Sequence, residues 1–143
     1  MFMPDVNVLV GAYRTDAPHH AELKAWIEAA VRAVEPLAVT DAVLGGYVRV
    51  VTHPRVFREP TPLKLALEHV SALRAAEGVL IVRPGEGFWS IFRKLCTDGE
   101  ARGNLVADAV HAATAIEAGA TWVTLDRDFA RFPRLDWRSP IET

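Results

Sequence analysis

The chain has 143 residues, of which 50% are hydrophobic and 24% are charged, and its formal net charge is −2. This composition is typical of one globular domain that is long enough to bury its own core. No apolar stretch approaches the roughly 18 residues that cross a bilayer, and Met1–Asp5 lacks the basic start of a signal peptide. The charge gives no electrostatic argument for a nucleic-acid partner, and the single Cys96 excludes an internal disulfide. We therefore expect one domain, residues 1–143, in the cytoplasm.

Short apolar runs alternate with segments of helical periodicity along the whole chain. The runs expected to be strands are Met1–Met3, Leu37–Thr40, Val79–Val82 and Trp122–Leu125, with Leu135–Trp137 as an edge strand. The segments expected to be helical are Asp16–Val34, Asp41–Thr52, Leu63–Ala76, Glu86–Thr97 and Leu105–Ala118, with a short turn at Asp128–Phe132. This alternation predicts an α/β fold with a mainly parallel sheet of four to five short strands.

Local signals predict where some of these helices begin, end or pack closely. Asp16 is expected to cap the first predicted helix, and Asn104 the last, which should end at Gly119. Gly45 and Gly46 lie inside a predicted helix, where each costs about 1 kcal/mol relative to alanine. We therefore expect something to pack or bind closely at this pair of glycines.

Five aspartates are expected near one edge of the sheet. Asp5, Asp41 and Asp126 directly follow predicted strands, and Asp128 lies two residues after Asp126. The carboxyl ends of parallel strands share one edge, and ligands of such sheets bind there. Asp108 lies in the first turn of a helix that is apolar almost all round, so we expect this helix and its carboxylate to be buried. Such a group needs a partner, because burying an unpaired charge is very costly.

Each aspartate also has an ordinary structural explanation. Asp5 could bond its own backbone in a turn, and Asp41 could cap a helix or be an acid in its first turn. Asp126 and Asp128 could form an Asx-turn and a helix cap, and Asp108 could face the positive end of its helix. Their repetition at strand ends favours a common role, because carboxylates packed together raise each other's pKa unless a cation neutralises them.

An all-oxygen ligand set selects Mg²⁺, Mn²⁺ or Ca²⁺ over zinc, and the five histidines are scattered along the chain. Mg²⁺ held by a few carboxylates usually serves phosphate chemistry and can lower the pKa of a bound water. We therefore predict hydrolysis of a phosphodiester by metal-activated water. Phosphoaspartate hydrolases and response-regulator receivers also use strand-end aspartates, but both need a late lysine, and the last lysine here is Lys94.

Four segments together carry a family resemblance that runs over essentially the whole chain. They are Pro4–Val10, Val50–Phe57, Asn104–Ala113 and Thr124–Phe132. These segments resemble the PIN-domain ribonucleases and, more narrowly, the VapC toxins of bacterial toxin–antitoxin pairs, in the branch common in mycobacteria. The resemblance implies a three-layer α/β/α sandwich formed by a single PIN domain.

The same resemblance implies a Mg²⁺-dependent endoribonuclease toxin in which Mn²⁺ can substitute. It also implies a homodimer with an RNA substrate, no membrane partner, and inhibition by a small VapB-type antitoxin encoded alongside. The residues that match the family's metal-binding acids are Asp5, Asp108 and Asp126, with Asp128 as an auxiliary acid and Asn7, Asn104 and Thr124 as supporting polar residues.

One position departs from the family pattern. Many PIN domains carry a glutamate in the helix after the second strand, near Gly45 and Gly46, and this branch often carries Ser-Glu one turn earlier. The residues at that position are Thr40 and Asp41 here. The side chain of aspartate is one methylene shorter than that of glutamate. We therefore expect Asp41 to act in catalysis and to reach the metal either directly or only through water.

Two questions stay open at the level of sequence. A degenerate PIN domain that acts as a non-catalytic RNA- or protein-binding module is the alternative function, because the acid at Asp41 is shortened. Basic residues that could contact RNA are Arg14, Arg49, Arg55, Arg58, Arg102 and His53.

Overall fold

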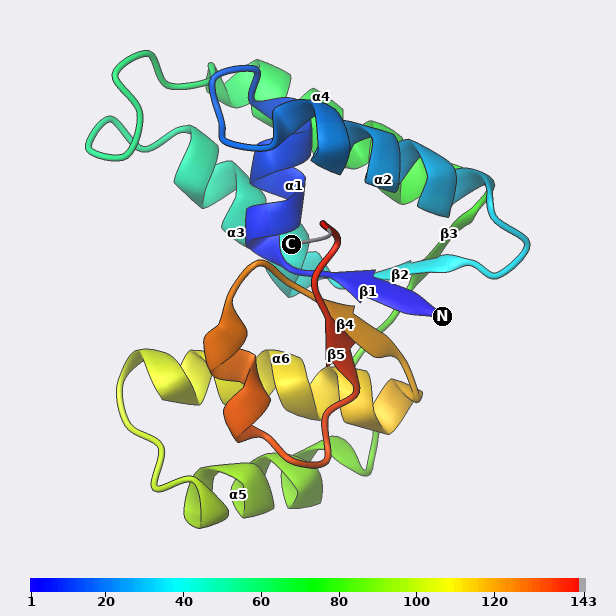
Figure 1. Ribbon diagram of the computed structural model, residues 1–143, viewed down its shortest axis with the longest axis vertical. Helices are drawn as coiled ribbons and strands as arrows, with labels where there is room; N and C mark the ends of the chain where they lie inside the picture. Colours follow the sequence, from blue (N-terminus) through cyan, green and yellow to red (C-terminus); the bar gives the residue numbers. More distant parts are fainter. Residues whose placement is uncertain (142–143) are drawn as a thin grey trace.

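A central five-stranded sheet lies between two layers of helices in the computed structural model, which describes residues 1–141 (Figure 1). The strands are β1 (Phe2–Pro4), β2 (Leu37–Val39), β3 (Val79–Ile81), β4 (Thr121–Val123) and β5 (Trp137–Arg138). Their order is β3-β2-β1-β4-β5, and every neighbouring pair is parallel. The predicted α/β/α sandwich is confirmed, and the carboxyl ends of β1, β2, β3 and β4 lie at one edge.

The helices divide between the two faces of the sheet. They are α1 (Val6–Tyr13), α2 (His20–Arg32), α3 (Asp41–Val51), α4 (Leu63–Ala75), α5 (Phe88–Asp98) and α6 (Asn104–Ala118), and the 3₁₀ turn η1 covers Arg127–Arg131. Helices α1 to α4 cover one face, whereas α6 covers the other face and is itself covered by α5 (Figure 1). None of the helices in the described part of the chain combines the length and apolar character that a transmembrane span requires.

Two predicted helix starts are wrong, and a neighbouring group explains each. Helix α2 begins at His20 and not at Asp16, because the Asp16 carboxylate is held by Arg14 through bonds of 2.9 Å to Nε and 2.6 Å to Nη2. Asn104 is the first residue of α6 rather than its cap. Gly103 takes the cap position with φ +60°, a conformation that glycine adopts without strain. The predicted end of α6 at Gly119, in the left-handed conformation, is confirmed.

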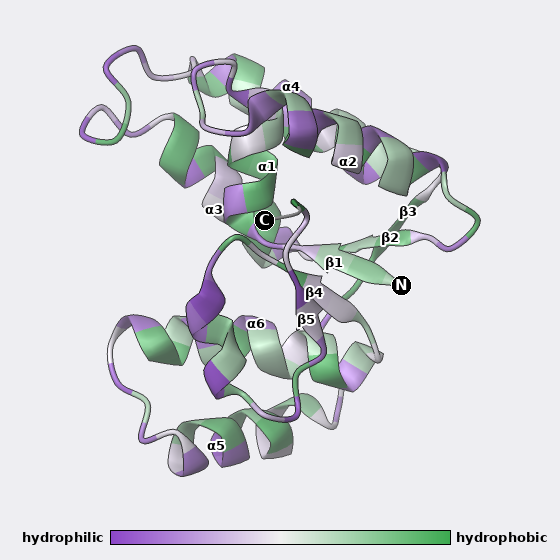
Figure 2. Ribbon diagram, in the orientation of Figure 1, coloured by the Kyte–Doolittle hydropathy of each residue, from purple (hydrophilic) through white to green (hydrophobic). Residues whose placement is uncertain are grey.

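The central strands are buried because helices cover both of their faces. Met3, Trp122 and Val123 are fully buried, and all residues of β2 are buried as well. Small side chains let α6 lie close to the sheet, and its fully buried residues are Ala109, Ala112, Ala113 and Ala115. Figure 2 shows hydrophobic residues along β1 and β2 and a hydrophilic segment after β4, at the charged 3₁₀ turn η1.

Gly46 brings α3 against α1, as the glycine pair predicted. A Cβ added at Gly46 would lie 2.7 Å from Cγ2 of Val6, whereas a Cβ at Gly45 would meet no heavy atom within 4 Å. The close approach therefore depends on Gly46 alone. It matters for the site, because Val6 directly follows Asp5 at the start of α1.

Replacement of each glycine by alanine is predicted to change stability in opposite directions. Gly45→Ala should raise the free energy of unfolding by about 0.5–1 kcal/mol, because alanine is the better helix former. Gly46→Ala should lower the free energy of unfolding by about 1 kcal/mol, because overpacking of the new Cβ against Val6 outweighs the gain in helix propensity. Denaturant unfolding of both variants measures the difference. Equal stability of the two would contradict the tight contact between α1 and α3.

Candidate metal centre

Asp5 links β1 to the first helix. Its backbone N–H donates to the carbonyl of Val123 at 2.8 Å, which keeps it in register with β4. Its Oδ1 accepts from the N–H of Val6 at 2.6 Å, so the side chain caps α1. The residue is only 8% exposed. Asp5 is therefore a helix cap, which its sequence alone did not predict, and also a carboxylate buried at the edge where ligands are expected.

Thr124 and Asn7 hold the Asp5 carboxylate from the β4 side. The hydroxyl of Thr124 donates to Oδ2 of Asp5 at 2.7 Å. The Asn7 amide donates to Thr124 Oγ1 at 3.2 Å and to Asp5 Oδ2 at 3.4 Å, while its Oδ1 accepts from the N–H of Leu125 at 3.2 Å. This network ties the ends of β1 and β4 together. Asn104, the third polar residue expected to support the acids, is exposed and forms no side-chain hydrogen bond within residues 1–141.

Asp126 and Asp128 continue from the same network. The N–H of Asp126 donates to Thr124 Oγ1 at 3.0 Å, and Oδ1 of Asp126 accepts from the N–H of Asp128 at 2.9 Å. Asp126 is thus the cap of η1, in the Asx-turn that one explanation of these residues required. Asp126 is half-buried, whereas Asp128 is exposed.

Asp108 completes an electrostatic group with these acids. Burial raises its pKa first, and the negative charges of Asp126, Asp5 and Asp128 raise it further, against a smaller opposing effect of His111. Burial also raises the pKa of Asp5, although hydrogen bonds from Thr124 and Val6 oppose the shift, and the charge of Asp126 adds to it. The carboxylates therefore lie near enough to repel one another.

The structure does not bring Asp41 into this group. Asp41 is the first residue of α3, after the Thr40 cap, and its carboxylate is paired with Arg74 on α4. Nε of Arg74 donates to Oδ1 at 2.9 Å, and Nη2 lies 3.5 Å from Oδ2. The hydrogen bond and charge of Arg74, together with the charge of Arg83, lower the pKa of Asp41, and no other carboxylate affects it.

The donor chemistry of the acidic group fits a hard divalent cation. Asp5, Asp108 and Asp126 offer only oxygen ligands, and the repulsion among them would be relieved by a positive charge. Among residues 1–141, no three Asp, Glu, His or Cys side chains stand in a ready-made ligand arrangement. The fit is thus one of charge and donor type, and the carboxylates would have to close around an ion to bind it.

Hollows flank the acidic edge on both sides. A cavity of about 550 Å³ has Asp5, Asn7 and Leu125 on one wall and Phe57 and Arg58 on another. A smaller cavity, about 270 Å³, lies between the start of α3, the segment after β3, and α6. Its polar lining residues are Thr40, Asp41, Arg83, His111 and Thr114.

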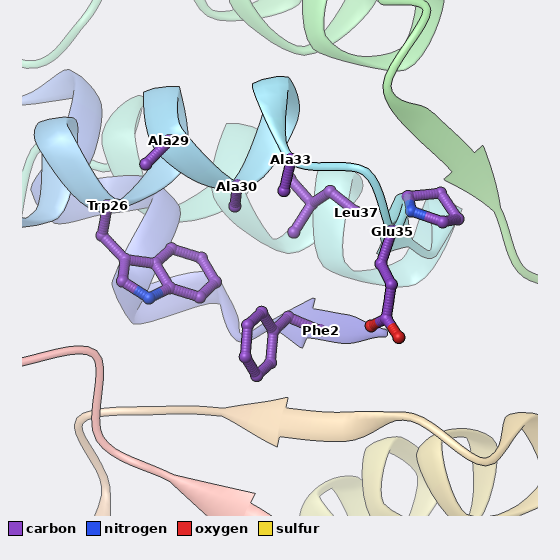
Figure 3. A pocket seen from close by; sticks show the side chains of 8 residues that line it. Phe2, Trp26, Ala29, Ala30, Ala33, Glu35 and Leu37 are labelled. Atoms are coloured by element: carbon purple, nitrogen blue, oxygen red, sulfur yellow. The ribbon is translucent and has the colours of Figure 1, made fainter.

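A further cavity, about 370 Å³, lies at the opposite end of β1 and β2 and is shown in Figure 3. Phe2 and Trp26 face it with ring centroids 5.8 Å apart. Its carboxylate, Glu35, already accepts a hydrogen bond of 2.6 Å from the N-terminal ammonium group. This apolar cavity is therefore not part of the acidic site.

The arginines considered for RNA contact differ in their availability. Arg14 donates to Asp16, to the Glu59 carbonyl at 2.8 Å and to Thr61 at 3.2 Å, and its guanidinium lies 3.9 Å from the centroid of the Phe57 ring. Only 11% of its side chain is exposed, so Arg14 anchors the loop before α4. The other candidate arginines, Arg49, Arg55, Arg58 and Arg102, are exposed.

Sequence reasoning missed three residues that border the acids: Arg74, Arg83 and His111. His111 follows Asp108 by one helical turn, and its ring stacks on Trp122 at 5.2 Å. Burial lowers the pKa of His111, and the charge of Asp108 opposes that shift. The spacing of three residues between Asp108 and His111 on an otherwise apolar helix could have signalled His111. The pairing of Arg74 with Asp41 could not be anticipated in this way, because it joins residues that are 33 positions apart.

Comparison with known proteins agrees with this architecture. The family model for the PIN domain matches residues 2–135. The chain belongs to the PIN domain family. Ribonuclease VapC43 of Mycobacterium tuberculosis is 49% identical to it over 142 residues, which cover 99% of this chain and 97% of that protein. Ribonuclease VapC25 of the same organism is 39% identical over 132 residues, with 92% and 93% of the two chains covered.

A solved structure has the same fold. A chain of VapBC2 from Rickettsia felis, bound to a DNA fragment from its promoter, superposes with a TM-score of 0.73 and 20% identity. The match covers 96% of this chain and 97% of that chain. At this identity the likeness extends to the fold, and the three-layer arrangement is that of a PIN domain.

Replacement of Asp108 by asparagine is predicted to stabilise the metal-free protein at neutral pH. The pKa of Asp108 is higher in the folded chain than in the unfolded chain, so its ionised form destabilises the fold. This penalty appears as the pH rises above the ordinary carboxyl range of about 4 and is absent below it. Asp108→Asn should therefore raise the midpoint of thermal unfolding in EDTA at pH 7, with little effect at pH 3.

Asp41→Asn is the matched control for this measurement. The pKa of Asp41 is lowered by Arg74, so its charge stabilises the fold above the ordinary carboxyl range and this effect is lost in acid. Asparagine at this position should leave the midpoint unchanged or lower it slightly, because exposed ion pairs contribute little. A lower midpoint for Asp108→Asn would show that the acidic group is not under repulsion.

Proposed function

We propose that this chain is a Mg²⁺-dependent endoribonuclease toxin of a toxin–antitoxin system. It hydrolyses RNA phosphodiester bonds with metal-activated water at the acidic edge, and a cognate VapB-type antitoxin inhibits it. The observation that carries the proposal is the carboxyl edge of a PIN-domain sheet, where Thr124 and Asn7 hold the buried Asp5 and where burial and neighbouring carboxylates raise the pKa of Asp5 and Asp108. Full-length similarity to proteins named VapC ribonucleases supports the same reaction class.

The proposed metal ligands are Asp5, Asp108 and Asp126, with Asp41 and Asp128 contributing through water. A bound Mg²⁺, or Mn²⁺ in its place, supplies a water of lowered pKa and positive charge for the attacked phosphate. Thr124 and Asn7 hold Asp5 in one orientation, and the cap of α1 fixes its other oxygen. Asp108 is half-buried and belongs to α6, which lies in the layer on the other face of the sheet. These contacts fix Asp5 in place before any ion arrives.

The proposed partners follow from the similar proteins. The superposed VapBC2 structure is a complex with promoter DNA, and this supports an antitoxin of VapB type for the present chain. We also propose that the chain forms a homodimer and acts in the cytoplasm.

Metal-dependent cleavage of RNA is the direct test of the proposal. Mg²⁺ or Mn²⁺ should support cleavage of single-stranded RNA, and EDTA should abolish it. Asp108→Asn should remain folded and lose activity by roughly a hundredfold or more, because a charge that stabilises the transition state is removed. Asp98→Asn, a change at an exposed aspartate of α5 that is paired with Lys94, should retain full activity. Gel analysis of cleaved RNA and circular dichroism provide both readouts, and undiminished cleavage by Asp108→Asn would contradict the mechanism.

A non-catalytic binding module is the second candidate function. Two observations favour it. The carboxylates do not stand in a ready-made ligand arrangement within residues 1–141, and the carboxylate of Asp41 is already hydrogen-bonded to Arg74. Titration calorimetry with Mn²⁺ separates the two functions. The enzyme should bind Mn²⁺ and lose this binding in Asp5→Asn, whereas a binding module should take up no metal at these residues.

A further inference from the structure

We propose that Arg74 and Arg83 form a binding site for an RNA phosphate beside the scissile bond, and that Asp41 positions Arg74 in it. This inference rests on the proposed ribonuclease function and identifies residues that would hold the substrate. Neither arginine was a candidate for RNA contact from the sequence.

Arg74 is held in one orientation while part of its guanidinium is free. Its Nε and Nη2 atoms engage the two oxygens of Asp41, which restricts a side chain that would otherwise be mobile. Its Nη1 atom forms no hydrogen bond within residues 1–141, and 44% of the side chain is exposed. The planar fork therefore presents donors to solvent in a fixed direction. Such an arrangement suits bidentate recognition of phosphate.

Arg83 adds a second positive charge at the same place. It follows β3 by two residues, at the carboxyl edge of the sheet, and forms no ion pair within residues 1–141. Its charge acts on Asp41, so the two residues are near each other. One carboxylate and two guanidinium groups leave a local charge of about +1. This small positive region adjoins an otherwise acidic edge.

The position of the pair places a phosphate close to the catalytic acids. Arg83 and Asp41 line the cavity of about 270 Å³ on one side, and His111 and Thr114 of α6 line it on the other. His111 lies near enough to Asp108 to affect its carboxylate. A phosphate bound by the two arginines would thus lie on the α6 side of the site, next to the bond that is hydrolysed.

A purely structural role explains these observations less completely. The start of α3 alone would stabilise the negative charge of Asp41, and an exposed ion pair adds little to stability. A structural ion pair accounts for Arg74, but it does not account for the exposed Arg83, which lines a cavity together with Asp41 and forms no ion pair within residues 1–141. Phosphate contacts explain both arginines, because they position RNA without reading its sequence.

Binding of labelled single-stranded RNA in EDTA tests the inference without involving cleavage. Fluorescence anisotropy over a series of salt concentrations gives the affinity and its salt dependence. The Arg74→Ala/Arg83→Ala double variant should bind on the order of tenfold more weakly, with a salt slope smaller by about 1.4 for two lost phosphate contacts. Arg32→Ala is the matched control, because Arg32 is also exposed and is paired with one carboxylate, Glu28, at 3.7 Å. It should bind RNA like the parent chain.

The Asp41→Ala variant distinguishes a role of Asp41 in orienting Arg74 from a purely electrostatic effect of its negative charge on RNA binding. Removal of a carboxylate should by itself strengthen binding to a polyanion, whereas loss of the residue that orients Arg74 should weaken it. Weaker RNA binding by Asp41→Ala in EDTA is therefore the expected result.

Three results would overturn the inference: no RNA binding by the parent chain, parental affinity and salt slope in the double variant, or an equal loss in Arg32→Ala. Failure of the proposed function would be visible separately, as a parent chain that binds RNA through the arginines but does not cleave it with Mg²⁺.

Discussion

Repulsion among carboxylates at the carboxyl edge of the sheet is the constraint on which the site depends. Asp5 is fixed in a buried position because its backbone belongs to the sheet and its side chain caps α1. Thr124 supplies a hydrogen bond that partly compensates for this burial. Asp108 and Asp126, which are both half-buried, then add negative charge beside it. The metal-free fold therefore stores an unfavourable interaction that a divalent cation would convert into a favourable one.

The alternation of apolar runs with segments of helical periodicity was sufficient to predict the sheet and its two helix layers. Buried strands and helices each repeat their apolar residues at a characteristic spacing, and this spacing can be read from the sequence. The resemblance of Asn104–Ala113 and Thr124–Phe132 to PIN domains specified the acids. The sequence pattern did not predict α1, because Val6–Tyr13 is apolar apart from Asn7 and therefore shows no alternation of apolar and polar helix faces. Its start depends on Asp5, whose capping role is visible only when β1 and β4 are paired.

The environment of Asp41 could not be predicted for a related reason. Its position after β2 and at the start of α3 was evident, and so was its short side chain. Its partner Arg74 lies in the last turn of a different helix, and only tertiary packing brings the two together. The same limit applies to Arg14, which resembled a surface cation until its contacts with the loop before α4 were seen. Side chains that bridge distant elements leave no periodic signal in the sequence.

The central claim is that the carboxylates of Asp5, Asp108 and Asp126 bind a divalent cation. NMR titration of the carboxyl groups tests this claim most directly. Asp5 and Asp108 should titrate above the ordinary range for aspartate in EDTA, because burial and mutual repulsion raise their pKa values. Saturating Mg²⁺ should bring both pKa values down, because the cation neutralises the repulsion between the carboxylates. Ordinary pKa values for Asp5 and Asp108 that do not respond to Mg²⁺ would contradict the account.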